Sequence, residues 1–95
     1  DETTLVFYVM GKMFCLVDIN DFDYCNLKCD PDEAQELRAL YEGIKPGYHM
    51  NKKHWNSVYF NSDVPFELIN NLVLKSYHLV VKKLTKKQHG LLYEI

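Results

Sequence analysis

The segment 47–56 contains the densest set of side chains in this 95-residue chain that could bind a ligand or react. Its candidate residues are Tyr48, His49, Asn51, Lys52, Lys53, His54 and Trp55. Lysines can contact phosphate groups, and aromatic rings can stack on nucleic-acid bases or anchor a protein partner. The alternative is structural: Trp55 and Tyr48 pack against the fold, and the lysines solvate a turn.

A second basic cluster lies near the end of a long helical pattern. It consists of Lys82, Lys83, Lys86 and Lys87. Lys75 and His78 precede Lys82 at helical spacings, so these three side chains should share one side of a helix. Together, the two clusters are candidates for contacting nucleic-acid phosphates. The structural alternative is that these cations complement the negative end of the helix dipole or form a solvated face.

Patterns for catalysis and metal binding are much weaker. The chain has no glycine-rich phosphate loop and no G-x-S-x-G nucleophile turn. His49, His54 and His78 could be metal ligands only if the fold brought them together, because zinc requires three or four converging ligands. Cys15 lies in an apolar segment, where burial should raise the pKa of its thiol. We therefore expect a binding domain rather than an enzyme, with no cofactor.

Size and composition indicate one globular domain over residues 1–95. The net charge is −2, but residues 1–42 carry 10 acidic and 3 basic side chains, whereas residues 43–95 carry 3 acidic and 8 basic ones. This asymmetry permits a basic face on an acidic protein. The apolar runs are far shorter than the ~20 residues of a membrane-spanning helix. Three cysteines are an odd number, typical of reduced thiols in a cytoplasmic protein.

Four segments are predicted to be β-strands because they are rich in β-branched and aromatic residues. They are residues 5–9, 12–17, 24–29 and 54–60. Gly11 can supply the positive φ of a tight turn between the first two strands. The third alternates polar and apolar residues, which predicts a half-buried strand. Short connections between the first three strands favour antiparallel pairing.

Helices are predicted from capping patterns and apolar periodicity. Asp30, Pro31 and Glu33 form a helix start, and Gly43 is a natural stop. The apolar stripe of this helix is Ala34, Leu37, Leu40 and Tyr41. A long helix with Pro65 in its first turn should end near Leu84. Its stripe is Ile69, Leu72, Val73, Ser76, Tyr77, Val80, Val81 and Leu84.

The remaining segments are a short helix and a loop. Thr85 and Gln88 form a capping box, which predicts a short final helix. Residues 44–51, with Pro46 and Gly47, are expected to form a connecting loop. The resulting order, β-β-β-α-β-α-α, predicts an α+β fold. We expect a two-layer sandwich in which a four-stranded antiparallel sheet has its helices on one face.

Three stretches of the chain resemble the MmcQ/YjbR family. They are residues 26–31 (NLKCDP), 46–56 (PGYHMNKKHWN) and 76–84 (SYHLVVKKL), and the resemblance extends from about Leu5 to Gln88. It implies a small bacterial protein with a compact α+β fold like that of CyaY, the bacterial frataxin. Family members are commonly described as DNA-binding proteins with a double-wing motif, which rests on likeness of fold.

The resemblance also gives an expectation about the first residues. Family members usually begin with a helix before the first strand, whereas this chain starts at Asp1 in an extended pattern. We therefore expect an exposed apolar patch on the helical side of the sheet, or a second chain covering it. The leading hypothesis is a DNA-binding domain that acts through the two basic clusters. The alternative is a protein-interaction or adaptor module, with a possible homodimer, that uses the sheet face and the 47–56 loop.

Overall fold

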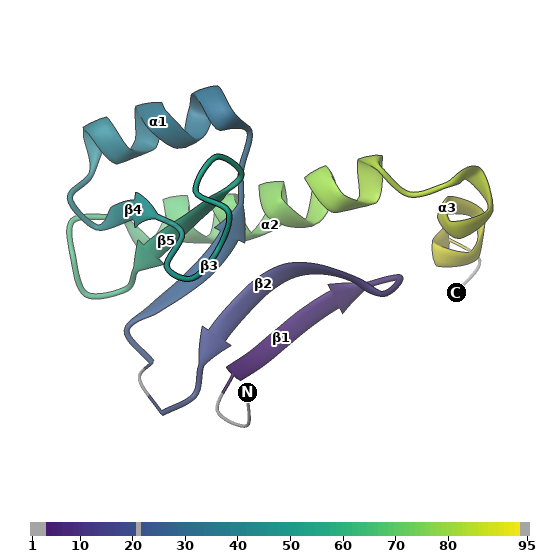
Figure 1. The fold of residues 1–95 in the computed structure, drawn as a ribbon, viewed down its shortest axis with the longest axis horizontal. Coiled ribbons are helices and arrows are strands. Elements are labelled where there is room, and N and C mark those ends of the chain that lie inside the picture. The colour runs from purple at the N-terminus through teal and green to yellow at the C-terminus, as the bar shows by residue number, and fades with distance from the viewer. Residues whose placement is uncertain (1–3, 21, 94–95) are drawn as a thin grey trace.

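A computed structural model describes residues 4–20 and 22–93 of the chain. Its five strands are β1 (Thr4–Val9), β2 (Lys12–Asp18), β3 (Tyr24–Lys28), β4 (Ile44–Pro46) and β5 (Trp55–Tyr59). Its helices are α1 (Pro31–Leu40), α2 (Phe66–Lys82) and α3 (Lys86–Tyr93). The strands form one antiparallel sheet in the order β1-β2-β3-β5-β4. The α+β fold is therefore confirmed (Figure 1).

The sheet has one strand more than the four predicted. The additional strand, β4, falls inside the segment expected to be a loop and pairs with β5 at the edge of the sheet. It spans only three residues and ends at Pro46, which has no N–H to donate to a ladder. Such a short segment carries no alternation that sequence reasoning could detect. The observed element order is β-β-β-α-β-β-α-α.

The first two strands are joined by a two-residue turn, as predicted at Gly11. Gly11 has φ 79° and Met10 has φ 49°, so both turn residues adopt the left-handed conformation that suits a tight hairpin. A bulge follows on β2, because Phe7 pairs with Cys15 whereas Tyr8 pairs with Met13. Phe14 is the extra residue, and its ring contacts Tyr77 of α2 edge-on at 5.4 Å. The bulge thus ties the hairpin to the long helix.

Helices α1 and α2 cover one face of the sheet, and the main core lies between the layers. Cys15, Cys25, Leu27, Ile44 and Val58 face the helices from neighbouring strands. The helices contribute Ala34, Leu37, Ile69 and Leu72 to the same cluster. A second cluster forms where Val9 packs against Val80, Val81 and Leu84. This second cluster fixes the C-terminal end of α2 beside the β1–β2 hairpin.

Helix α1 starts as predicted and ends differently. Asp30 is the N-cap, and its carboxylate accepts a hydrogen bond from the backbone N–H of Glu33 at 3.3 Å. The helix ends at Leu40, with Tyr41 as the C-cap, and Leu40 is 72% exposed, so its place in the apolar stripe was wrong. Gly43 lies beyond the C-cap, where a side chain would collide with Ser62. The position requires glycine because the chain packs closely there.

Helix α2 buries most of the predicted stripe. Ile69, Leu72, Ser76, Val80 and Val81 are buried within it, and the helix ends at Lys82, two residues before the expected Leu84. The capping box of α3 is confirmed, because the backbone N–H groups of Thr85 and Gln88 each donate to the side chain of the other. None of the helices in the described residues is long and apolar enough to cross a membrane.

The face of the sheet opposite the helices is covered in part by the β4–β5 loop. Asn26 and Ser57 lie on this face and are nevertheless buried. The backbone carbonyl of Tyr48 accepts a hydrogen bond from Asn26, and its N–H donates to the hydroxyl of Ser57. Strand β3 is therefore buried on both faces at Asn26, rather than half-buried along its whole length.

The expected apolar patch on the helical side is present at β1. Leu5 and Phe7 pair with Val17 and Cys15, so they lie on the helical face, yet they are 48% and 43% exposed. Helix α2 contacts mainly β2 and β3 and meets this outer strand at Val9, so Leu5 and Phe7 are left partly uncovered.

Candidate nucleic-acid interface

The topology brings the basic segments to one end of the sheet. Because the strands are antiparallel, the start of β2, the end of β3 and the start of β5 lie at the same end. The packing of Val9 against Val80 and Val81 places the C-terminal end of α2 there too. We call this the basic end. In Figure 1 the hairpin tip, the end of α2 and α3 lie on the right of the molecule.

Positive and negative charges are separated along the strands. Strand β2 begins at Lys12 and ends at Asp18, and Asp23 precedes the start of β3, which ends at Lys28. The two lysines therefore lie at the basic end and the two aspartates at the opposite end. The acidic first half of the sequence thus contributes Lys12 and Lys28 to the basic end, but Asp30 and Glu33 at the start of α1 lie there too, beside Lys28.

Lys28 lies at the centre of the basic end. Burial and the positive charges of Lys83 and Lys12 lower the pKa of its ammonium group. Its Nζ lies 6.0 Å from the centroid of the Trp55 ring, within the range of a cation–π contact. Across residues 4–20 and 22–93, the one ion pair joins Lys75 to Glu33, so no carboxylate in this range pairs with Lys28. Three lysines from different elements thus interact unfavourably there.

The β4–β5 loop, residues 47–54, begins and ends at the basic end and is held by its own polar groups. The ammonium group of Lys52 donates to the carbonyl of Gly47 at 2.6 Å. The side chain of Asn51 accepts from the backbone N–H of Lys53 at 2.9 Å. Lys52 and Asn51 therefore close the loop, whereas the side chain of Lys53 is exposed.

Arg38 of α1 supports the same loop from behind. Its guanidinium donates to the Oδ1 of Asn56 at 2.7 Å and to the backbone carbonyl of Lys52. Asn56 is buried and also donates to the carbonyl of Ala34. Sequence reasoning missed Arg38 as a positioning residue, because the chain gave no sign that α1 reaches the loop.

Trp55 does not form an open stacking surface in this structure. It is 7% exposed, and Lys28 lies over its ring, so the structural alternative describes it better than stacking on a base. Tyr48 differs, because it is 55% exposed and its ring contacts that of His49 at 4.0 Å. His49 has φ 59°, a left-handed conformation that turns the loop outward beside Tyr48.

The other predicted residues divide by exposure. Lys53, Lys82, Lys83, Lys86 and Lys87 are exposed, whereas His54 is half-buried. The carbonyl of His54 accepts from the N–H of Cys29 at 2.8 Å, which fixes the loop next to the end of β3. The two predicted clusters therefore share the basic end, with Lys28 between them.

Sequence reasoning missed Lys12 and Lys28. Both lie in the acidic half of the chain and at strand ends, so neither belongs to a local run of cations. Only the antiparallel register reveals that the start of β2 and the end of β3 are neighbours. Aligning predicted strands by their turns would have found this pair.

The groups at the basic end are poorly suited to metal binding or to nucleophilic chemistry. Within the described part of the chain, no three histidine, cysteine or acidic side chains converge to hold a metal ion. Burial, with the nearby charges of Glu33 and Asp30, raises the pKa of the Cys29 thiol to about 11. A thiol with this pKa is protonated near neutral pH and is a weak nucleophile.

Comparison with known proteins places the chain among bacterial relatives. It is 42% identical over 83 residues to the uncharacterized protein YbdF of Escherichia coli O157:H7, covering 86% of this chain and 68% of YbdF. It is 39% identical over 75 residues to the uncharacterized protein YyaQ of Bacillus subtilis (strain 168), covering 79% of this chain and 63% of YyaQ. The chain thus spans about two thirds of the length of these relatives.

A solved structure shows the same fold. The crystal structure of Deinococcus radiodurans protein DR2400, described as a DUF419 domain, matches with a TM-score of 0.85 and 41% identity. That match covers 95% of this chain and 70% of DR2400. The model of the YjbR family matches residues 1–79. The chain therefore belongs to the YjbR family.

Proposed function

We propose that this domain binds nucleic acid through the phosphate backbone, at the basic end of its sheet. The contacts would come from lysines of four elements and their connections, all of them exposed except Lys28, which is half-buried. They are Lys12, Lys28, Lys53, Lys82, Lys83, Lys86 and Lys87. The observation that carries the proposal is the convergence of Lys12, Lys28 and Lys83: burial, and then repulsion from the charges of Lys83 and Lys12, lower the pKa of Lys28.

A polyanion would relieve that repulsion. Each phosphate that meets a lysine also releases condensed counterions, which supplies affinity at low salt without reading sequence. Lys28 keeps its charge at a cost to folding, and such costs concentrate at functional sites. The ring of Tyr48 is exposed on the face of the sheet opposite the helices, where it meets Tyr24 edge-on at 6.3 Å, and it could stack on an unpaired base of a strand that continues from the basic end across that face.

The expected binding is weak and depends strongly on salt. The net charge of −2 opposes long-range attraction to a polyanion, and Asp30 and Glu33 lie close to Lys28. A protein that makes four or five phosphate contacts should lose on the order of 100-fold in affinity between 50 and 200 mM salt. We therefore expect binding to be measurable near 20–50 mM salt and to be lost near 200 mM.

The direct test is a fluorescence-anisotropy titration of labelled duplex and single-stranded DNA at several salt concentrations. The proposal predicts binding to unrelated sequences with a steep, linear fall of log K against log salt. Tyr48→Ala should weaken binding to the single strand more than to the duplex, by about 1 kcal/mol or more if a base stacks on the ring. Absence of binding to both forms at low salt would exclude the proposal.

A second candidate function, protein interaction, is favoured by strand β1. It is an edge strand whose Leu5, Phe7 and Tyr8 are exposed, and unpaired apolar edges are sites for strand addition or self-association. A partner chain or a second copy could pair with this edge and cover Phe7.

Salt separates the two candidates. An apolar interface on β1 should persist at 500 mM salt, whereas phosphate contacts should not. Phe7→Lys should abolish self-association measured by light scattering while leaving DNA binding intact. If the protein stays monomeric at high concentration, self-association through β1 is excluded. A different protein partner would then be sought by capture on the β1 edge.

A further inference from the structure

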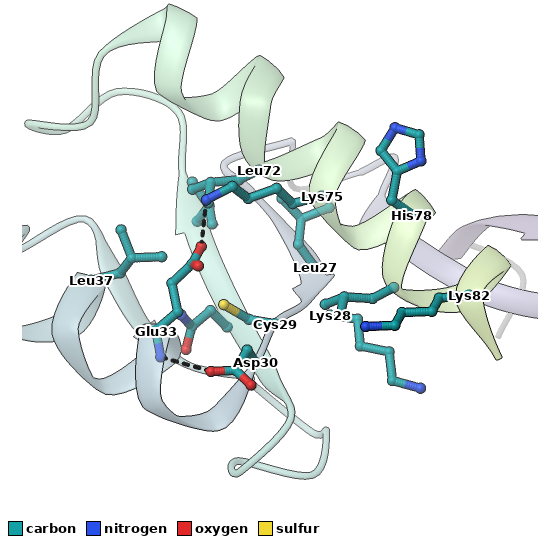
Figure 2. A pocket seen from close by; sticks show the side chains of 13 residues that line it. Leu27, Lys28, Cys29, Asp30, Glu33, Leu37, Leu72, Lys75, His78 and Lys82 are labelled. Atoms are coloured by element: carbon teal, nitrogen blue, oxygen red, sulfur yellow. Dashed lines mark hydrogen bonds and ion pairs between the residues drawn. The ribbon is translucent and has the colours of Figure 1, made fainter.

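An apolar cavity of about 260 Å³ lies between α1 and α2, above strands β3 and β5. Its walls are the side chains of Leu27, Leu37, Val58, Leu72 and Leu79. The first four are buried in the core, so the floor is rigid and preformed. Figure 2 shows the two helices, which share one face of the sheet, on either side of the cavity.

Charged groups form the rim of the cavity. Lys75 of α2 reaches across to Glu33 of α1, with 3.0 Å between Nζ and Oε1, so this ion pair spans the mouth (Figure 2). Asp30 is engaged as the cap of α1. Lys82 projects from the same side of α2 as Lys75, and it has no ion-pair partner among the described residues. The predicted grouping of Lys75, His78 and Lys82 is confirmed, because all three line this cavity.

We propose that this cavity binds a small carboxylic acid with an apolar body, such as a medium-chain fatty acid or an aromatic carboxylate. The hydrocarbon part of the ligand would contact the leucines, and its carboxylate would meet Lys82 and Lys75 at the rim. The share of liquid volume of one water molecule is about 30 Å³, so the cavity of about 260 Å³ has room for about eight or nine groups of that size. The inference does not depend on nucleic-acid binding, although the two sites share Lys82.

The ion pair across the mouth provides the anion site. The side chains of Lys75 and Glu33 are 59% and 35% exposed, and exposed pairs contribute little to stability. A ligand carboxylate can therefore replace Glu33 as the partner of Lys75 at small cost. Removing the Glu33 charge should then strengthen ligand binding, because the competing carboxylate is gone.

The cavity is suited to reversible binding rather than covalent chemistry. Cys29 is the nucleophilic side chain in its lining, and its thiol is protonated near neutral pH because burial raises its pKa to about 11. The site therefore acts as a receptor for the acid. Lys82 also belongs to the basic end, so an acid bound there would neutralise one of the cations proposed to contact phosphate.

The test compares three probes with the same chain and different head groups: octanoate, octanol and octylamine. Titrations followed by two-dimensional NMR of the isotope-labelled domain report both the affinity of each probe and the location of its binding site. We expect octanoate to bind with Kd on the order of 0.1–1 mM, shifting the amides around Leu27 and Leu72. Octanol should bind about two- to fivefold more weakly, and octylamine more weakly still, because one exposed ion pair is worth that much.

Matched variants locate the site. Lys82→Ala should lower the affinity for octanoate about two- to fivefold. Lys83→Ala, one residue away and outside the lining of the cavity, should leave that affinity unchanged. Leu79→Phe should fill the cavity and weaken all three probes at least tenfold, while Leu74→Phe, on an exposed position of α2, serves as the control. Glu33→Gln should raise octanoate affinity.

Several outcomes would overturn the proposal. One is that the three probes bind with equal affinity. Another is that Lys82→Ala and Lys83→Ala change octanoate binding equally. A third is that the chemical-shift changes caused by the probes are confined to strand β1. Thermal melts of each variant identify any that fail to fold, and the head-group comparison on the unaltered protein stands without them. DNA binding should respond to both lysines alike, so failure of this site and failure of the proposed function are distinguishable.

Discussion

The hydroxyl of Ser76, in the middle of α2, accepts a hydrogen bond from the backbone N–H of Lys28 at 2.9 Å. The same hydroxyl donates to the backbone carbonyl of Phe14, and Ser76 is fully buried. A single serine thus joins the long helix to the end of β3 and to the bulge of β2. This joint fixes the backbone of Lys28 relative to α2 and to the start of β2.

Ser76→Ala should therefore destabilise the domain and loosen its basic end. The substitution leaves a buried N–H and a buried C=O without partners, which should cost about 2–3 kcal/mol of the free energy of unfolding. Urea denaturation measures this change. Ser62→Ala, at an exposed serine, is the matched control and should stay within about 0.5 kcal/mol. Equal effects of the two substitutions would contradict the role of Ser76.

Lys28→Met should stabilise the protein at pH 7. The folded state lowers the pKa of Lys28 through burial and through Lys83 and Lys12, so the charged form is penalised. The penalty is fully present below the folded pKa, shrinks as pH rises through it, and is gone above the unfolded value near 10.4. Denaturation curves from pH 7 to pH 10.5 should therefore show the advantage of the variant decreasing with pH. A variant that is less stable at pH 7 would refute the electrostatic reading.

Asp63→Asn should destabilise the protein at neutral pH but not in acid. The carboxylate of Asp63 accepts hydrogen bonds from the backbone N–H groups of Gly43 at 2.8 Å and Glu42 at 2.9 Å, and these bonds lower its pKa below the ordinary 3.8. The stability it contributes is present above that ordinary value and is lost as pH falls through the folded pKa. Melting temperatures of the two proteins should differ at pH 7 and converge as the pH falls well below 3.8, where the carboxyl group is protonated in both the folded and the unfolded state. A constant difference across this range would count against the assignment.

The three cysteines should be reduced and unreactive in the native protein. Cys15, Cys25 and Cys29 are buried. A hydrogen bond with Cys15, together with burial, raises the pKa of Cys25, and burial raises the pKa of Cys29. The predicted rise for Cys15 was wrong, because its hydrogen bond with Cys25 outweighs burial and lowers its pKa. An Ellman titration at pH 8 should give a negligible rate without denaturant and three thiols in guanidinium chloride. Fewer than three after denaturation would reveal a bond or a modification.

Local chemistry made much of this fold predictable. The roles of three features, Asp30, Gly11 and the Thr85–Gln88 capping box, could be predicted from neighbouring residues, because each acts within a few residues of its own position. The stripe of α2 was predictable because helical periodicity extends over many residues. Strand β4 was not, because its pairing with β5 depends on a partner far along the chain and only three residues carry it.

The residues of the candidate site show the same difference between local patterns and contacts that depend on distant segments. The lysines at 82–87 and Lys53 could be chosen from sequence because they form runs. The roles of Lys12, Lys28 and Arg38 depend on register and on the approach of α1 to the loop, which no local pattern encodes. Trp55 was the opposite case: its residue type indicated a binding surface, whereas the fold uses its ring to fill the space beneath Lys28.

The salt dependence of DNA binding by charge variants tests the central proposal most directly. The measurement is the slope of log K against log salt for duplex DNA, in the unaltered protein and in three variants. Lys83→Ala should reduce the slope by about 0.9, and Lys28→Ala with Lys83→Ala by about 1.8, because each lost phosphate contact removes roughly that much. Lys45→Ala, on the exposed edge strand β4, removes one equal charge; because Lys45 lines a hollow with Asp23 and Tyr59 at the opposite end of the sheet, it should leave the slope unchanged. Equal slopes for all four proteins, or no binding at 20 mM salt, would contradict nucleic-acid binding at the basic end.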